Sequence, residues 1–305
     1  MAIIEVNRLR KLYGNQVAVD DISFDVEHGE IFGIVGPNGA GKTTTVECLA
    51  GLRIPESGTI AINGLDPVRD RTEIRRCVGV QTQSSALPEK LKVWEAVHLY
   101  GSFYHRPADT ERLLGEVGLK EKRATRYGKL SGGQKQRLSI TLALVGDPRI
   151  AILDELTTGL DPQARRDTWE LIEQVRDRGI TVVLVTHSME EAERLCDRVA
   201  VIDRGRVVAV DSPAGLVRRA GSGERVCFRP SAPIDDRLLT DLPGVTRVSH
   251  DSDHLIVTGA GDLTVAVLTA LVGHGVRALD LRVAQSTLED AFLTLTGHPL
   301  EVRHE

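Results

Sequence analysis

Short apolar runs alternate with segments of helical periodicity over the first two thirds of the chain. Residues 31–35, 150–153, 181–185 and 199–202 have the length and the branched apolar side chains of buried strands. Between the later runs, apolar residues recur every three or four positions, which is the spacing of an amphipathic helix. This alternation of strands and helices predicts an α/β layer with a largely parallel sheet.

Helix ends are also readable in this part of the sequence. Asp161 precedes Pro162, a pair that favours a helix start, and Gly179 predicts the end of the same helix. Ser188 is followed three residues later by Glu191, which is the spacing of a reciprocal capping box. Two helices are therefore expected, one beginning after Asp161 and one after Ser188.

The pattern changes after about residue 210. Pro213 and the arginine- and glycine-rich stretch 218–223 predict a linker, so we place a domain boundary near residue 220. The sequence thus predicts two domains, residues 1–220 and residues 221–305, the second a small α+β module. Its last helix is expected to be capped by Ser286 and Glu289 and to end at Gly297. The expected strands lie near 226–229, 245–249, 255–258 and 276–283, and the expected helices near 263–271 and 287–296.

Composition narrows the class of protein. The 305 residues are 41% hydrophobic and 27% charged, as in soluble globular proteins, and the net charge of −5 gives no overall attraction for nucleic acid or anionic lipid. No apolar run reaches the roughly 18 residues that cross a bilayer. No export signal is evident, so a cytosolic protein is expected. The four cysteines form no paired motif, which argues against disulfides and structural zinc.

A glycine-rich segment follows the first of these predicted strands. Residues 36–44 read Gly-Pro-Asn-Gly-Ala-Gly-Lys-Thr-Thr and precede a helical pattern, the context of a phosphate-binding P-loop rather than of a plain turn. Backbone N–H groups of such a loop surround phosphate oxygens, and the following helix presents its positive dipole end. The lysine is expected to neutralise the β- and γ-phosphates, and the first threonine to hold Mg²⁺. The candidate nucleotide-binding residues here are Gly36, Asn38, Gly39, Gly41, Lys42, Thr43 and Thr44.

Two carboxylates end another predicted strand. Asp154 and Glu155 directly follow the apolar run 150–153. Alone this is a weak signal, because apolar strands often end at a capping aspartate. Beside a P-loop, Asp154 is expected to hold a Mg²⁺-bound water, and Glu155 to orient and polarise the attacking water.

A second helix start combines a hydroxyl with glycines. Residues 130–134 read Leu-Ser-Gly-Gly-Gln, in which Ser131 and Gln134 have the spacing of a capping box. The same hydroxyl and glycine amides at a helix N-terminus also form an anion site. Because the P-loop already serves this chain's own phosphate, we expect Ser131, Gly133 and Gln134 to serve the nucleotide of a neighbouring chain.

With this LSGGQ segment between the P-loop and the Asp-Glu strand end, the sequence resembles the ATP-binding cassette (ABC) family over residues 1 to about 215. The resemblance implies a P-loop NTPase with a RecA-like core and antiparallel β and helical subdomains, which hydrolyses ATP with Mg²⁺. It also implies head-to-tail pairing of two cassettes, as a homodimer or with a paralogue. Each ATP then lies between one P-loop and the partner's copies of Ser131 and Gly133.

The resemblance assigns further residues. Tyr13 resembles the aromatic residue that stacks on adenine, although it also fits simple turn packing. Gln83 resembles the glutamine near Mg²⁺ and the γ-phosphate, with Gln81 as a competing candidate. Asp161 resembles an aspartate that crosses the dimer interface, and His187 the switch histidine that contacts the γ-phosphate. The implied catalytic set is Glu155, His187 and Gln83, and the implied metal set is Thr43, Gln83 and Asp154.

Two positions depart from the family pattern, Leu156 and Lys92, and at Lys92 a threonine commonly caps the following helix. Leu156 stands where the family usually has a proline after the catalytic glutamate. Leucine has a backbone N–H and a less restricted φ, so the orientation of Glu155 and the rate of turnover are left open by the sequence.

A transporter built on this ATPase needs a pore, and the resemblance implies a separate integral membrane permease. Aromatic and apolar residues after Gln83 either pack on the chain's own helical subdomain or line a groove for a helix of that permease, bordered by Gln83, Leu87 and Trp94. The residues at helical spacing are Val93, Val97, Tyr100 and Tyr104, with Trp94 and Phe103 alongside.

The end of the chain carries a second resemblance. Residues 286–297 are similar to the ending of ATP-binding subunits of ABC-2 type exporters, including the daunorubicin-resistance type. This implies an ABC-2 permease, a peripheral position on the inner face of the cell membrane, and export. Drugs or antibiotics are one candidate class of substrate, and lipids, polysaccharides and peptide-like compounds are the alternatives.

The alternative is a non-transport ABC ATPase that acts on nucleic acid or the ribosome. Such proteins usually carry two cassettes, a long coiled coil or zinc-binding cysteines, and this sequence shows none of them. We therefore expect no nucleic-acid partner. A kinase or GTPase is a poorer alternative, because no guanine-specific Asn-Lys-x-Asp loop is present.

Overall fold

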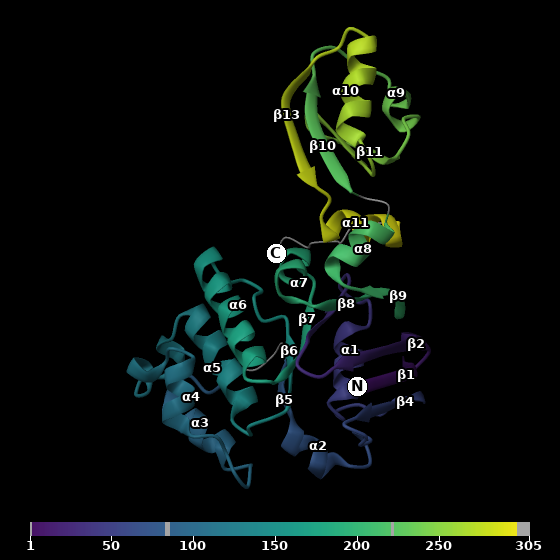
Figure 1. Cartoon of the computed structure of the whole chain (residues 1–305). Helices are drawn as coiled ribbons and strands as arrows, with labels where there is room; N and C mark the ends of the chain where they lie inside the picture. The colour runs from purple at the N-terminus through teal and green to yellow at the C-terminus, as the bar shows by residue number, and fades with distance from the viewer. Residues whose placement is uncertain (1, 83–85, 221–222, 298–305) are drawn as a thin grey trace. The chain divides into compact units, whose positions relative to one another are not determined.

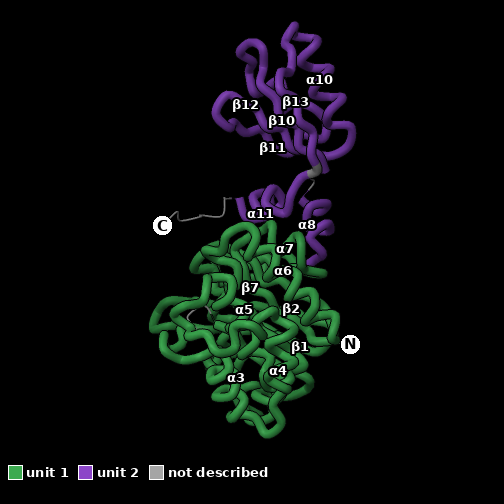
Figure 2. The backbone as a smooth tube through the Cα atoms, turned by 90° about the vertical axis from the view of Figure 1, so that its left-hand side faces the viewer, with its two compact units in different colours: residues 1–210, 301–305 green, residues 211–300 purple. Residues whose placement is uncertain are grey.

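The computed structural model describes residues 2–82, 86–220 and 223–297. The chain forms two compact units, one over residues up to Val210 and a second from Asp211 to Leu300 (Figure 2). The predicted boundary near residue 220 lies ten residues beyond this division. The helix between them, α8 (Pro213–Arg219), therefore belongs to the second unit.

A six-stranded sheet is the centre of the first unit, in the order β5-β6-β7-β3-β8-β9. β3 pairs in parallel with β7 and β8, and β6 pairs in parallel with β5 and β7, so the predicted parallel sheet is confirmed. The branched apolar residues of β3, β6 and β7 are fully buried because helices or a second sheet cover both faces. The bounds are β3 (Ile31–Val35), β5 (Val78–Gln81), β6 (Ile150–Asp154), β7 (Thr181–Thr186), β8 (Arg198–Asp203) and β9 (Arg206–Asp211).

An antiparallel sheet and one helix cover one face of this central sheet. β1 (Ala2–Tyr13) lies between β2 (Gln16–Glu27) and β4 (Ser57–Ile62), and α1 (Lys42–Leu49) lies on the same side (Figure 1). Their inward side chains join those of β3, β6 and β8 in one apolar core, which includes Ile4, Ile22 and Phe32. That core fixes α1, and with it the loop that precedes α1.

Helices cover the opposite face. α5 (Gly132–Leu144) and α6 (Pro162–Asp177) pack on the strands, and α3 (Val93–Gly101) and α4 (Thr110–Glu116) lie beyond α5 (Figure 1). α6 starts after Asp161 as predicted. α7 (Met189–Leu195) likewise starts after Ser188, so both helix starts predicted from the sequence are found. α2 (Arg71–Cys77) and two single 3₁₀ turns, Lys120–Lys122 and Tyr127–Lys129, complete the described part of this unit.

The second unit contains a four-stranded antiparallel sheet in the order β11-β12-β10-β13. With helices α9 and α10, the chain order is βαββαβ, which is the ferredoxin-like arrangement. α9 and α10 pack on one face of the sheet, around Phe228, Val257 and Val267. The bounds are β10 (Glu224–Pro230), α9 (Arg237–Thr240), β11 (Val245–Asp251), β12 (His254–Gly259), α10 (Leu263–Gly273), β13 (Ala278–Gln285) and α11 (Leu288–Thr296).

Two details of this unit differ from the sequence-based expectation. The predicted linker includes α8, whose cap is the Ser212 side chain accepting from the N–H of Gly215; the arginine-rich composition concealed it. The last helix is capped one residue later than expected, by Thr287 and Asp290 instead of Ser286 and Glu289. Its end at Gly297, with φ of 78°, is as predicted. In the described ranges, no helix has both the length and the apolar character that crossing a membrane requires.

Candidate nucleotide-binding site

The P-loop connects the buried strand β3 to α1, at the carboxyl edge of the central sheet. Gly41 has φ of 100°, and a Cβ atom there would lie 2.3 Å from the carbonyl oxygen of Ala18. Gly39 also has a positive φ, of 79°, but no neighbouring atom lies within 4 Å. Glycine is therefore favoured at both positions because the backbone has a positive φ there, which other residues adopt only at a cost.

Lys42, the first residue of α1, is buried within this loop. Its Nζ donates hydrogen bonds to the carbonyl oxygens of Gly36 at 2.8 Å and Pro37 at 3.0 Å. Burial lowers the pKa of Lys42, and the carboxylates of Glu155 and Asp154 partly oppose that shift. The ammonium is thus held inside the loop, beside both predicted carboxylates. Thr43 and Asn38 are exposed, and Thr44 is half-buried.

Asp154 ends β6 and is 1% exposed. Its Oδ1 has no hydrogen-bond partner in the part of the chain that the structure describes. Burial raises the pKa of this carboxyl to about 6, and nearby Glu155 adds to the rise while Lys42 opposes it. A buried carboxylate with an unpartnered oxygen fits a cation ligand, because a cation would hold it ionised. The exposed Thr43 hydroxyl lies beside this carboxyl, since its hydrogen bond lowers the pKa of Asp154.

Glu155 and His187 follow the adjacent parallel strands β6 and β7. Glu155 has φ of 49°, in the left-handed region, and its N–H donates to Val185 O at 2.9 Å. Its Oε1 lies 3.3 Å from His187 Nδ1. This hydrogen bond lowers the pKa of Glu155 and raises the pKa of His187, in both cases against the effect of burial. The structure therefore brings the two predicted catalytic residues into contact.

Leu156 is fully buried. With leucine at this position, the Glu155 side chain still reaches His187, so the departure from the family pattern is compatible with that orientation. The leucine acts as a core residue directly after the strained backbone of Glu155.

Ser131 and Asp161 are helix caps, as predicted. The N–H of Gln134 donates to Ser131 Oγ at 3.3 Å, and the N–H of Ser131 donates to Gln134 Oε1 at 3.1 Å, which completes a capping box. Asp161 Oδ1 accepts from the N–H groups of residues 163 and 164. Ser131 is exposed, as is Gly132, and Gly133 is half-buried at the same helix start. No hydrogen bond or ion pair between described residues joins these caps to the P-loop.

The remaining predicted residues lie elsewhere. Tyr13 ends β1 and is 42% exposed, with Lys11 Nζ 5.6 Å and the Arg53 guanidinium 5.9 Å from its ring centroid. Gln83 lies outside the described residues. Gln81, its competitor, is buried in β5, where its side chain accepts from the N–H of Asp154 at 3.1 Å. Gln81 thus has a structural partner in the backbone of Asp154, not in its carboxylate.

Sequence reasoning missed one buried contact near this site. Glu191 was expected to return a hydrogen bond to Ser188 in a capping box, but only the serine half of that box forms. Glu191 is fully buried, and its Oε1 accepts from Trp169 Nε1 of α6 at 3.1 Å. The helix that follows His187 is therefore tied to the helix that follows Asp161. The sequence carries one sign of this contact, since a tryptophan in an otherwise charged helix is expected to be buried and to need an acceptor for its N–H.

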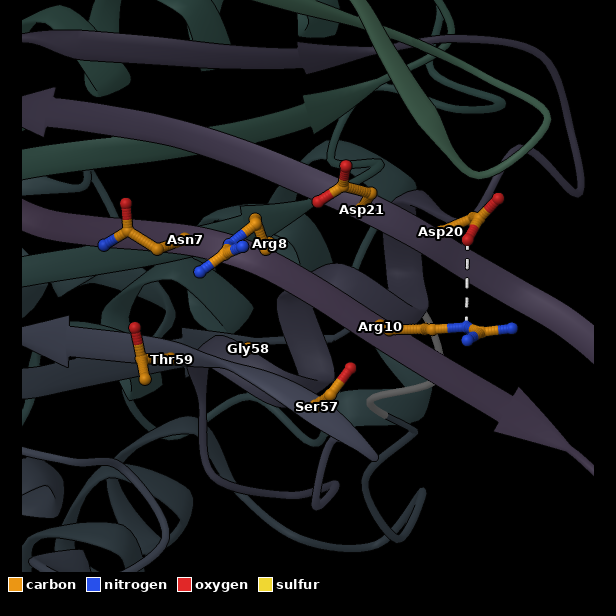
Figure 3. A pocket seen from close by; sticks show the side chains of 8 residues that line it. All are labelled: Asn7, Arg8, Arg10, Asp20, Asp21, Ser57, Gly58 and Thr59. Carbon is orange, nitrogen blue, oxygen red and sulfur yellow. Dashed lines mark ion pairs between the residues drawn. The ribbon is translucent and has the colours of Figure 1, made fainter.

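A separate hollow of about 560 Å³ lies on the antiparallel sheet (Figure 3). Arg10 and Asp20 line it as a loose ion pair at 3.7 Å, and Asp20 also pairs with Arg206. Arg8 and Asp21 line it too, each with a positive φ. It shares no lining residue with the P-loop, and its two arginines and two aspartates balance in charge.

Comparison with known proteins agrees with this geometry. The family described as "ABC transporter" matches residues 19–158. Nod factor export ATP-binding protein I of Paraburkholderia xenovorans (strain LB400) is 38% identical, covering 98% of this chain and 99% of that protein. Linearmycin resistance ATP-binding protein LnrL of Bacillus subtilis (strain 168) is 32% identical, with the same two coverages.

Solved structures agree as well. The ATP-binding subunit of an ABC transporter is 31% identical with a TM-score of 0.65, covering 72% of this chain and 93% of that one. A bacterial ABC transporter cassette solved as a dimer is 27% identical with a TM-score of 0.62, covering 68% of this chain and 98% of that one. The fold is that of a P-loop NTPase of the cassette type.

The chain belongs to the ABC transporter family. It is the ATP-binding subunit, and its cassette is an ATPase. The expected family, fold and enzyme class are therefore confirmed.

Proposed function

We propose that this subunit powers export through a separate membrane permease of the ABC-2 type, by pairing with a second cassette. Two full-length relatives support the direction, since their names describe Nod factor export and linearmycin resistance. By analogy with those names, the substrate class is a Nod-factor-like or antibiotic-like compound. The proposed place of work is the inner face of the cell membrane.

The observation that carries the proposal is the exposed capping box at Ser131. The 13-residue helix α5 begins at an exposed serine and an exposed glycine, and no hydrogen bond or ion pair between described residues joins this helix start to the P-loop. Such a helix start favours an anion. We infer that the anion is the γ-phosphate held by the P-loop of a second cassette. Gly133, Gln134 and the exposed Asp161 then face that cassette.

ATP is then held by groups from both chains. In one chain, the P-loop amides and Lys42 bind the phosphates, Tyr13 stacks on adenine, and Thr43, Asp154 and Gln83 are the proposed Mg²⁺ ligands. Bound Mg²⁺ would neutralise phosphate charge. Lys42 would exchange its bonds to Gly36 and Pro37 for phosphate oxygens, which are stronger acceptors.

Hydrolysis needs a group that orients water. The Glu155 carboxylate is ionised at neutral pH, because its pKa is lowered, and it is only 10% exposed. It would accept a hydrogen bond from the attacking water, while His187 holds its carboxylate and contacts the γ-phosphate. The loss of that phosphate removes contacts made only in the paired state, so the pair reopens.

The helical subdomain is the proposed docking surface for the permease. Val93 and Val97 of α3 are buried, as the packing interpretation expects, and so is Ala96 between them. Phe103 is 73% exposed and Leu99 is 48% exposed. Trp94 and Leu87 are half-buried, and Trp94 contacts His98 edge-on. Trp94→Ala should leave ATP binding intact and reduce transport-coupled ATPase activity in membranes that contain the permease.

The test is ATP-dependent pairing in solution. Glu155→Gln with ATP should form dimers, measured by multi-angle light scattering, and should hydrolyse ATP at least a hundredfold more slowly. Adding Ser131→Arg should abolish dimers while nucleotide titration shows unchanged binding. Lys42→Ala should weaken nucleotide binding itself. Persistent monomers of Glu155→Gln with ATP, even with the permease present, would refute the pairing mechanism.

A further inference from the structure

The second unit contains a hollow between the open face of its sheet and α11. It measures about 170 Å³ and is lined by residues of β10, β11 and β12 on one wall and α11 on the other. Val226, Phe228 and Val257 point from the sheet to the core under α9 and α10. Strand alternation therefore puts their neighbours, including Arg225 and Thr258, on the face that α11 covers.

The sheet wall presents polar groups without partners. Arg247 and Ser249 of β11 line the hollow, and neither side chain has a hydrogen bond or ion pair in the described ranges. The Thr258 side chain likewise makes none, although this residue is only 5% exposed. Buried and half-buried hydroxyls beside a guanidinium normally have a partner, so these groups are available to a ligand.

The helix wall presents the opposite charge. Glu289 lines the hollow and forms no ion pair with any described residue. Asp290 uses Oδ2 to cap α11 through Thr287, and its Oδ1 lies 3.8 Å from Arg225, beyond hydrogen-bond distance. An unpaired cation on the sheet wall and an unpaired anion on the helix wall thus line the hollow, together with a loose Arg–Asp pair.

We propose that this hollow binds a small zwitterion that carries one carboxylate and one ammonium group, of the α-amino acid class. Two guanidiniums and two carboxylates line it. A ligand with one positive and one negative group can pair with both kinds of charge, whereas a simple anion is repelled by the carboxylates and a simple cation by the guanidiniums. The ligand carboxylate meets Arg247 with the hydroxyls of Ser249 and Thr258, and its ammonium meets Glu289. Ile256 and Leu293 supply an apolar contact for a short aliphatic side chain.

The size of the hollow agrees with this class. At about 30 Å³ for each water, 170 Å³ holds roughly six waters, which suits an amino acid and is too small for a nucleotide. The opposite side of α11 is already occupied, since Leu288, Ala291 and Phe292 are buried and α11 packs against α8. The apolar side of α11 therefore packs on the protein, and its polar side lines the hollow.

The proposal is independent of the proposed export function, because it uses only residues of the second unit. Calorimetric titration of the full chain with each of the twenty standard α-amino acids is the direct test. At least one should bind with millimolar affinity or better, and its decarboxylated amine and its deaminated acid should each bind at least tenfold more weakly. No binding by any amino acid, or equal binding by both single-charge analogues, would overturn it.

Variants locate the site. Arg247→Met and Glu289→Gln should each weaken the binding roughly tenfold to a hundredfold, the usual effect of losing a charged hydrogen bond. Arg277→Met is the control, because Arg277 is an exposed arginine of the same unit outside the hollow. Thermal unfolding without ligand checks folding of all three. Unchanged binding by Arg247→Met, or an equal loss in Arg277→Met, would place the ligand elsewhere.

Discussion

Nδ1 of His187 lies 3.3 Å from Oε1 of Glu155, across the ends of adjacent strands. The contact raises the pKa of the histidine and lowers the pKa of the glutamate. The stability from Glu155 is present above its usual pKa of 4.5 and is lost as pH falls. The stability from His187 is present below 6.5 and is lost as pH rises through its raised pKa. Both groups are charged between the lowered pKa of Glu155 and the raised pKa of His187.

This contact predicts that Glu155→Gln lowers the pKa of His187. A neutral amide cannot stabilise the imidazolium as a carboxylate does, and burial then favours the neutral ring. The pKa is read from the pH dependence of the His187 imidazole signal in NMR spectra. Signals of the exposed histidines are the internal control, and an unchanged His187 titration would contradict the contact.

Asp154 predicts a pH-dependent cost to stability. Burial raises the pKa of Asp154 from near 4 to about 6. The folded protein therefore keeps its full stability below pH 4, where this carboxyl is protonated, and loses stability as the pH rises through 6. Without Mg²⁺ and nucleotide, Asp154→Asn should therefore be more stable than the natural protein at pH 7, by up to about 3 kcal/mol. The difference should disappear near pH 4.

Chemical unfolding at several pH values measures this effect. Asp177→Asn is a matched control, because Asp177 is 66% exposed beside Arg176, and its change should stay within about 0.5 kcal/mol. Should Asp154→Asn be the less stable protein at pH 7, the contacts of the carboxylate with Thr43 and Lys42 outweigh the cost of its burial.

The Trp169–Glu191 hydrogen bond predicts a coupled pair. Trp169→Phe removes the only donor that the described residues give to Glu191 Oε1, and Oε2 already lacks a partner. The free energy of unfolding should fall by about 1–3 kcal/mol. In a Glu191→Gln background the same change should cost less, because no buried charge remains. Equal costs in both backgrounds would show that only packing matters.

Two glycines of the P-loop form a matched test of backbone crowding. Gly39→Ala introduces strain from a φ of 79° but no clash, and should cost about 1–2 kcal/mol. Gly41→Ala adds a methyl group 2.3 Å from Ala18 O, so its cost should be clearly larger. Urea unfolding compares the two. A smaller cost for Gly41→Ala would mean that the loop shifts freely.

Local signals in the sequence predicted most of the cassette. Residues 31–35 form β3 as expected, and the caps at Ser131 and Asp161 have the expected hydrogen bonds, because caps and buried strands depend on neighbours in the chain. The P-loop and the Asp154–Glu155 strand end are similarly local. Their nearness follows from parallel strands whose carboxyl ends share one edge.

What the sequence did not predict depends on contacts between distant residues. Glu191 has ideal capping spacing, but a tryptophan 22 positions earlier takes its carboxylate. Gln81 and Gln83 could be ranked only by resemblance, and the contact of Gln81 with Asp154 spans 73 positions. α8 was hidden by residues typical of linkers, because its burial comes from α11, which lies about seventy residues further along the chain.

Glu224 and Gln285, at the start of β10 and the end of β13, are direct partners in adjacent strands. The chain thus enters and leaves the βαββαβ module side by side. A short glycine-serine bridge could replace everything between them while α8 and α11 keep their own connection. Recombination at this one point could therefore exchange the whole module while the sequence of the cassette stays unchanged.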